Sequence, residues 1–82
     1  MKTTTEAALR AAVAREHSFA DFHEAAAGRR EAPRVAPART EQARAQHTLA
    51  ALAHRRAAAV IEAAAAVIAE GDLAEVKELS SK

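Results

Sequence analysis

Apolar positions in the first third of the chain recur at alternating steps of three and four residues. The repeat runs through Leu9, Ala12, Glu16, Phe19, His23 and Ala26, with Val13 and Phe22 beside it. Residues spaced in this way share one face of an α-helix, so the pattern predicts a helix over residues 4–27. Gly28 follows directly and suits the left-handed conformation in which many helices end.

A second stretch repeats every seven residues. Its members are His47, His54, Ile61 and Ile68, with Ala50, Ala57 and Ala64 between them. A repeat of seven is typical of the seam between two packed helices, and alanine at one of the two seam positions lets the neighbouring helix approach closely. The pattern predicts a second helix over residues 38–70, with Thr40 as an alternative N-cap residue.

Proline and glycine divide the chain further. Pro33 and Pro37 interrupt helical geometry, so residues 28–37 are expected to connect the two helices. Gly71 is expected to end the second helix, and the spacing from Asp72 to Glu75 is that of a capping box. A short third helix over residues 73–79 would follow. Its apolar residues are Leu73, Val76 and Leu79. The predicted fold is one all-α domain, an antiparallel helical hairpin with a short third C-terminal helix.

The high alanine content leaves few large apolar side chains to form a hydrophobic core. Alanine fills 26 of 82 positions, and only 15 residues are larger apolar types. Chains this short bury a modest share of their surface and are often completed by oligomerisation. We therefore expect two copies to pair as a homodimer and form a four-helix bundle.

The two predicted helices differ in length, which predicts an uncovered end. Helices of about 24 and 33 residues span roughly 36 and 50 Å, so the C-terminal turns of the second project past the first. The apolar residues at that end form the predicted dimer or partner interface. They are Val60, Ile61, Val67, Ile68, Leu73, Val76 and Leu79. The alternative is that the third helix folds back as a lid over this surface.

Groups able to do chemistry are few. The chain has no Cys, its serines have no recognisable base beside them, and no glycine-rich phosphate loop is present. We therefore expect no enzyme activity, no cofactor and no small-molecule substrate. The four histidines are His17, His23, His47 and His54. They lack the four-residue spacing of helical metal sites, so no metal is expected; a polar layer that sets the helix register and a surface position without a role both stay open.

Charge is unevenly distributed although the net charge is +1. Residues 28–56 carry seven arginines and two glutamates, whereas residues 57–82 carry two lysines and five acidic residues. The arginines are Arg29, Arg30, Arg34, Arg39, Arg44, Arg55 and Arg56. Guanidinium groups neutralise phosphates, which makes a nucleic-acid-binding regulator the alternative function. The low net charge and the scarcity of aromatic stacking residues make it the less favoured one.

Location and function follow from these absences and from the apolar end. No apolar stretch near Met1 has the character of a secretory signal, and residues 57–69 are too few to cross a bilayer, so we expect a cytoplasmic protein. Nine Arg against three Lys, and no Asn, favour a bacterial source. The predicted function is a small non-catalytic protein–protein interaction module, such as an adaptor, inhibitor or regulator of the kind that phages and mobile elements encode. Its expected partners are a second copy and another protein.

Overall fold

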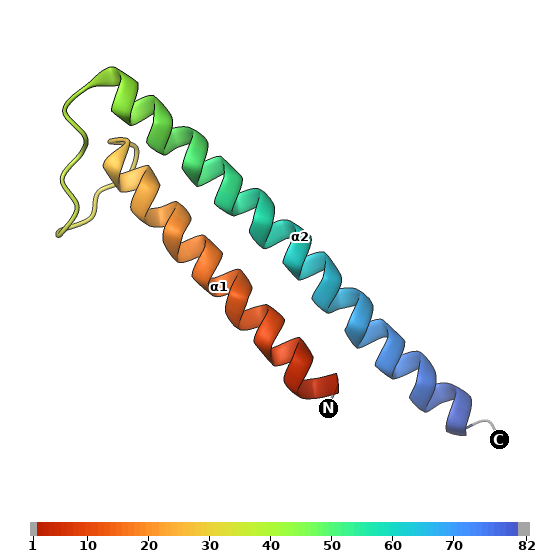
Figure 1. Ribbon diagram of the computed structural model, residues 1–82. Helices are drawn as coiled ribbons and strands as arrows, with labels where there is room; N and C mark the ends of the chain where they lie inside the picture. The colour runs from red at the N-terminus through yellow and green to blue at the C-terminus, as the bar shows by residue number, and fades with distance from the viewer. Residues whose placement is uncertain (1, 81–82) are drawn as a thin grey trace.

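Two antiparallel helices make up the fold. The computed structural model describes the backbone of residues 2–80 and the side chains of residues 5–71. Helix α1 spans Lys2–Ala26 and helix α2 spans Glu41–Ser80, and they lie side by side (Figure 1). The molecule measures 64 × 20 × 16 Å, which is a single layer of two helices. The prediction of an all-α helical hairpin is confirmed.

The end of α1 follows the glycine rule that the sequence indicates. Gly28 has φ of 78°, and its N–H donates to Ala25 O at 3.0 Å. The N–H of Arg29 donates to Glu24 O at 2.9 Å. These two bonds satisfy carbonyl groups that the last turn of the helix leaves without a helical partner. A residue with a side chain would be strained at this φ, so glycine is needed here.

Thr40 determines where α2 begins. Its Oγ1 accepts a hydrogen bond from Ala43 N at 3.1 Å, which is the bond of an N-cap residue. The helix therefore starts at Glu41, three residues later than the predicted start at residue 38. The residues before Thr40 are tied to α1, because Ala38 N donates to Ala26 O at 2.7 Å. This bond holds the two helices close together at the turn.

Helix α2 does not end at Gly71. It continues to Ser80, so the expected break and the separate helix over residues 73–79 are not seen. Gly71 lacks a positive φ, and a Cβ added there would meet nothing within 4 Å. A glycine inside a helix costs about 1 kcal/mol relative to alanine, which good helix formers on both sides can outweigh. The side chains of Leu73, Val76 and Leu79 lie outside the described residues.

Alanine forms the buried core. The buried apolar residues are Ala20, Ala25, Ala26, Ala27, Ala51, Ala58 and Ala65. Among the residues whose side chains the structure describes, no large side chain is fully buried. Each buried methyl group contributes at most about 0.8 kcal/mol, so this core is small. Helix–helix packing here depends on close backbone approach over small side chains.

The buried alanine column of α2 is displaced by one residue from the predicted one. Ala51, Ala58 and Ala65 are between 0 and 4 % exposed, whereas Ala64 of the predicted column is exposed and Ala57 is half-buried. From His47, a step of three and a step of four both lead to an alanine. Only one of these two alanines can face α1, and the pattern of apolar residues along the chain does not show which one.

The seam of α1 also differs from the predicted stripe. Ala20 is fully buried, whereas Phe19 and Phe22 are 52 and 48 % exposed. The α1 seam therefore runs through positions that alternate steps of four and three. They are Leu9, Val13, Glu16, Ala20, His23 and Ala27. The two phenylalanines flank this seam instead of filling it.

Two cross-helix contacts give the register. His23 contacts His47, and Glu16, seven residues earlier, contacts His54, seven residues later. A further step of seven residues, toward the N-terminus on α1 and toward the C-terminus on α2, places Leu9 level with Ile61. The next such step places the start of α1 level with Ile68. Folding the two predicted helices back to back about residues 28–37 places residue 27 level with Arg39 and residue 4 level with Glu62. This predicted register is wrong by about one turn. Helix α2 still extends beyond the N-terminal end of α1 (Figure 1).

Candidate interaction surface

The hairpin has two faces of opposite character, one on each side of the helix–helix seam. The α2 seam consists of His47, Ala51, His54, Ala58, Ile61, Ala65 and Ile68. In an antiparallel pair, residues that directly follow seam positions on both helices lie on one side of the layer. Residues that directly precede seam positions lie on the other. We call these the charged face and the apolar face.

The charged face consists of the residues that follow seam positions. They are Arg10, Ala14, His17, Asp21 and Glu24 of α1, and Thr48, Leu52, Arg55, Ala59, Glu62 and Ala66 of α2. Arg55 is its centre. Its Nη2 donates to Asp21 at 2.8 Å and Glu24 at 2.7 Å, and its Nη1 lies 2.6 Å from His17 Nδ1. Hydrogen bonds to Asp21 and Glu24 raise the pKa of Arg55 above its ordinary value. These bonds link the helices across this face.

The apolar face consists of the residues that precede seam positions. They are Ala8, Ala12, Arg15, Phe19, Phe22 and Ala26 of α1, and Gln46, Ala50, Ala53, Ala57, Val60, Ala64 and Val67 of α2. Arg15 and Gln46 are the only polar members. The four large residues are exposed in the single chain, with Phe19 at 52 %, Phe22 at 48 %, Val60 at 70 % and Val67 at 66 %. Contiguous apolar surface of this kind marks interaction sites in soluble proteins.

The size of this face can be judged from the helix dimensions. Helix α1 has 25 residues and the layer is 20 Å wide. At 1.5 Å per residue, the part of the face that both helices share, from Ala8 to Ala26 on α1, is about 28 Å long and covers about 570 Å². A standard protein–protein interface buries about 800 Å² on each partner. Two such faces together bury about 1,100 Å², which exceeds the total of about 1,000 Å² expected of a specific interface.

Histidines occupy the middle of the seam. His23 Nδ1 lies 2.8 Å from His47 Nδ1, and the His23 ring stacks on His54 with centroids 5.5 Å apart. His54 Nδ1 also contacts a carboxylate oxygen of Glu16. Phe19 packs on His54 at a centroid distance of 5.2 Å. Burial, and then the neighbouring His47 and His54, lower the pKa of His23. Within the described residues, no group of three or more His, Cys, Asp or Glu could hold a metal ion.

The predicted interface residues are found in different places. Val60 and Val67 lie on the apolar face and are exposed, whereas Ile61 and Ile68 are half-buried at the seam. The remaining three have side chains outside the described residues. Phe19 and Phe22 were assigned to the seam and are instead the largest residues of the apolar face. The signal that locates them is their position directly before Ala20 and His23.

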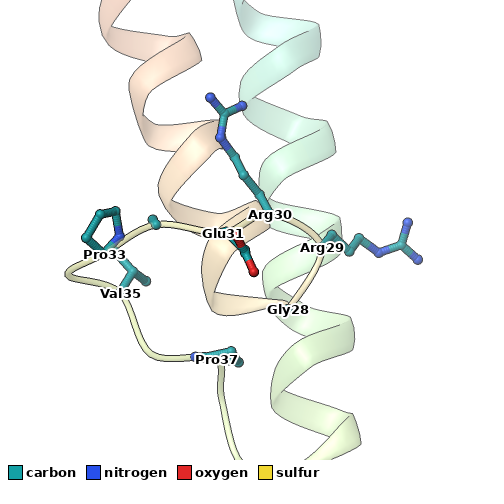
Figure 2. A pocket seen from close by; sticks show the side chains of 8 residues that line it. Gly28, Arg29, Arg30, Glu31, Pro33, Val35 and Pro37 are labelled. Atoms are coloured by element: carbon teal, nitrogen blue, oxygen red, sulfur yellow. The ribbon is translucent and has the colours of Figure 1, made fainter.

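The predicted basic segment does not form one patch. Arg30 binds Asp21 at 3.0 Å, Arg55 binds two carboxylates, and Arg44 Nε donates to Ala38 O at 2.6 Å. Residues 28–37, which connect the helices, line an open pocket of about 850 Å³. The side chains of Arg29 and Arg30 point in different directions from it (Figure 2). Three of the seven arginines are thus engaged within the described part of the chain.

The fold and this surface define a class, a two-helix hairpin with an alanine core and one exposed apolar face. No protein-family model, curated protein or solved structure matches the chain. Neither described helix contains a stretch that is long and apolar enough to cross a membrane.

Proposed function

We propose that this protein is a small non-catalytic interaction module that binds protein partners through its apolar face. One observation carries the proposal: from Ala8 to Ala26 on α1 and from Gln46 to Val67 on α2, the residues that precede the seam are apolar except Arg15 and Gln46, and the four large ones are 48 to 70 % exposed. Burying apolar area contributes roughly 25 cal/mol per Å². Removal of these side chains from water is therefore the main contribution of this surface to the free energy of binding.

Phe19 and Phe22 supply the anchors. They lie three residues apart and therefore share one flank of α1. Phe19 is backed by the ring of His54, and Phe22 by the rings of His23 and His47 at 5.2 and 6.3 Å. Aromatic side chains held by neighbouring rings lose little conformational freedom on binding, and aromatic residues are enriched in the cores of interfaces.

The opposite face supports the same assignment. Its central charges are paired within the chain, since Arg55 binds Asp21 and Glu24. Groups already satisfied in this way gain little from a partner. Charged contacts at the centre of this face stabilise the hairpin, and Leu52 is its one exposed large apolar residue, whereas the apolar face exposes four. The partner that fits a long, flat apolar face is a helix or helix pair with an apolar stripe.

The test compares two neighbouring substitutions. Val60→Glu places a charge on the apolar face, and Ala59→Glu places the same charge on the charged face one residue away; both positions are exposed, so the hairpin tolerates both. Wild-type chain and both variants are chemically cross-linked to the proteins that they bind. Each partner identified in this way, including the chain itself, is then purified, and its affinity for each of the three chains is measured.

We expect wild type and Ala59→Glu to bind the re-tested partner equally and Val60→Glu to bind at least tenfold more weakly, because a charge buried in an apolar contact costs several kcal/mol. Equal binding by all three chains, or loss only in Ala59→Glu, would refute the proposal.

A further inference from the structure

We infer that the partner on the apolar face is a second copy of this chain, placed so that α1 of each copy lies against α2 of the other. This inference rests on the proposed function and names the partner for that surface. It follows from the way large and small residues are distributed over the face.

Large residues of one helix are level with small residues of the other. In the register given by His23 and His47, Phe19 lies between the levels of Ala50 and Ala53, and Phe22 lies between the levels of Gln46 and Ala50. Thus α1 carries its two largest residues near the turn, where the apolar-face residues of α2 are two alanines and Gln46. Toward the open end of the hairpin the relationship reverses.

At that open end, α2 is the bulky helix. Val60 lies between the levels of Ala8 and Ala12, as continuing the register by sevens shows. A face of this kind fits a copy of itself if each α1 is laid on the partner's α2 at the same level. Phenylalanine then packs on alanine at one end and valine on alanine at the other, which is the alternation that close packing needs.

A two-fold axis parallel to the long axis of the hairpin produces this arrangement. It carries α1 onto α2 of the second copy without changing level, and it leaves every helix antiparallel to its neighbours. A two-fold axis across the long axis instead lays α1 on α1, with the phenylalanines over Ala8 and Ala12. That arrangement brings the two copies of Arg15 together, and like charges in an apolar interface are unfavourable.

The single chain also lacks a core of large apolar side chains, which a second layer of helices would supply. It is one layer of helices with an alanine core and no fully buried large side chain in its described part. The shared face of about 570 Å² per copy gives a total of about 1,100 Å², which is enough for a specific interface at the small end of the usual range. Pairing two copies forms a four-helix bundle whose centre contains the phenylalanine and valine side chains that the single chain leaves in water.

Cysteine pairs test both the partner and the arrangement, because the natural chain has no cysteine. Tagged chain with Ala8→Cys is mixed with untagged chain carrying Ala64→Cys; both positions are exposed, level with each other and on the apolar face. The matched control pair is Ala14→Cys with Ala59→Cys, which are exposed and lie within one helical turn of the same level on the charged face. Sedimentation of the wild-type chain up to high micromolar concentration gives its mass.

We expect a wild-type particle of twice the chain mass of 8.6 kDa. The first cysteine pair should form a mixed disulfide dimer, with little dimer from either cysteine chain alone and little from the control pair. Absence of the mixed disulfide dimer, or a control pair that links equally fast, overturns the arrangement. A wild-type monomer overturns the inference: if it still binds another protein and Val60→Glu abolishes that binding, the proposed function stands, and if it binds nothing, both fail.

Discussion

His23 and His47 share a hydrogen bond between their Nδ1 atoms, 2.8 Å apart, across the seam between the two helices. One ring must donate its N–H and the other must accept, so the accepting ring is neutral. His23 also stacks on His54, whose Nδ1 contacts Glu16. The seam therefore contains a polar layer between the alanine layers, and its geometry depends on the protonation of its imidazoles.

Acid should destabilise the hairpin through His23. Its pKa is lowered in the folded chain, first by burial and then by His47 and His54, so the unfolded chain binds this proton more tightly. The stability tied to neutral His23 is therefore complete above about pH 6.5 and is lost as the pH falls through the lowered pKa. Thermal unfolding followed by circular dichroism should show a midpoint that decreases below that pH.

His23→Gln provides the control for this prediction. The amide keeps a hydrogen-bonding group beside His47 and cannot be protonated in this range. Its midpoint should change less with pH than that of the wild type. An equal pH dependence in the two proteins would show that His23 is not the responsible group.

Ala58 should not tolerate a larger side chain. It is fully buried in the seam, where the helices approach over methyl groups, so Ala58→Leu should cost about 1–3 kcal/mol of unfolding free energy by overpacking. Ala59→Leu is the control, because the neighbouring side chain is exposed on the charged face. Urea unfolding would measure both. Equal stabilities for the two variants would contradict a close alanine seam.

The two glycines should respond to alanine in opposite directions. Gly71→Ala meets no neighbour within 4 Å in a continuous helix and should increase helix stability by about 1 kcal/mol. Gly28→Ala must adopt φ near 78° and should decrease stability by about 1–2 kcal/mol. Helical content and thermal midpoint report both changes. A loss of helix in Gly71→Ala would instead support the break that the sequence predicts at this position.

Arg55 should contribute more to hairpin stability than its neighbour Arg56. Arg55 donates to Asp21 and Glu24 of the other helix, whereas Arg56 is exposed and makes no ion pair within the described residues. Arg55→Gln should lower the thermal midpoint, and the difference from wild type should shrink as salt screens the charges. Arg56→Gln should leave the midpoint near that of wild type. A salt-independent difference would point to lost side-chain packing.

The sequence predicts the hairpin well because its signals are local. Gly28 and the two prolines mark the turn, and the repeat of seven marks a packed helix. The column facing the seam is harder to predict in an alanine-rich chain, because Ala50 and Ala51 are equally small and only the cross-helix fit separates them. The register error has the same origin, since sliding one alanine column past another changes the buried volume very little.

The candidate surface was predicted in part for the same reason. Val60 and Val67 are exposed on the apolar face, and so are Phe19 and Phe22, which the sequence pattern places in the seam. Large aromatic residues are usually buried, and a stripe through them is an equally good helical repeat. Only the burial of Ala20, and the pairing of Arg55 with residues on the other side of α1, show that the phenylalanines lie on the open flank.

The most direct test of the two-faced hairpin is the solvent accessibility of methyl groups, measured by NMR with a soluble paramagnetic agent. In the single chain Val60 and Val67 are 70 and 66 % exposed, and Ala59 and Ala66 on the charged face are also exposed. In concentrated wild-type protein, the two valine methyl signals should be protected from relaxation by the agent and the two alanine methyl signals should not, with the valine protection lost on dilution. Valine methyl groups that relax as fast as those of Ala59 and Ala66 at every concentration would contradict self-association through the apolar face.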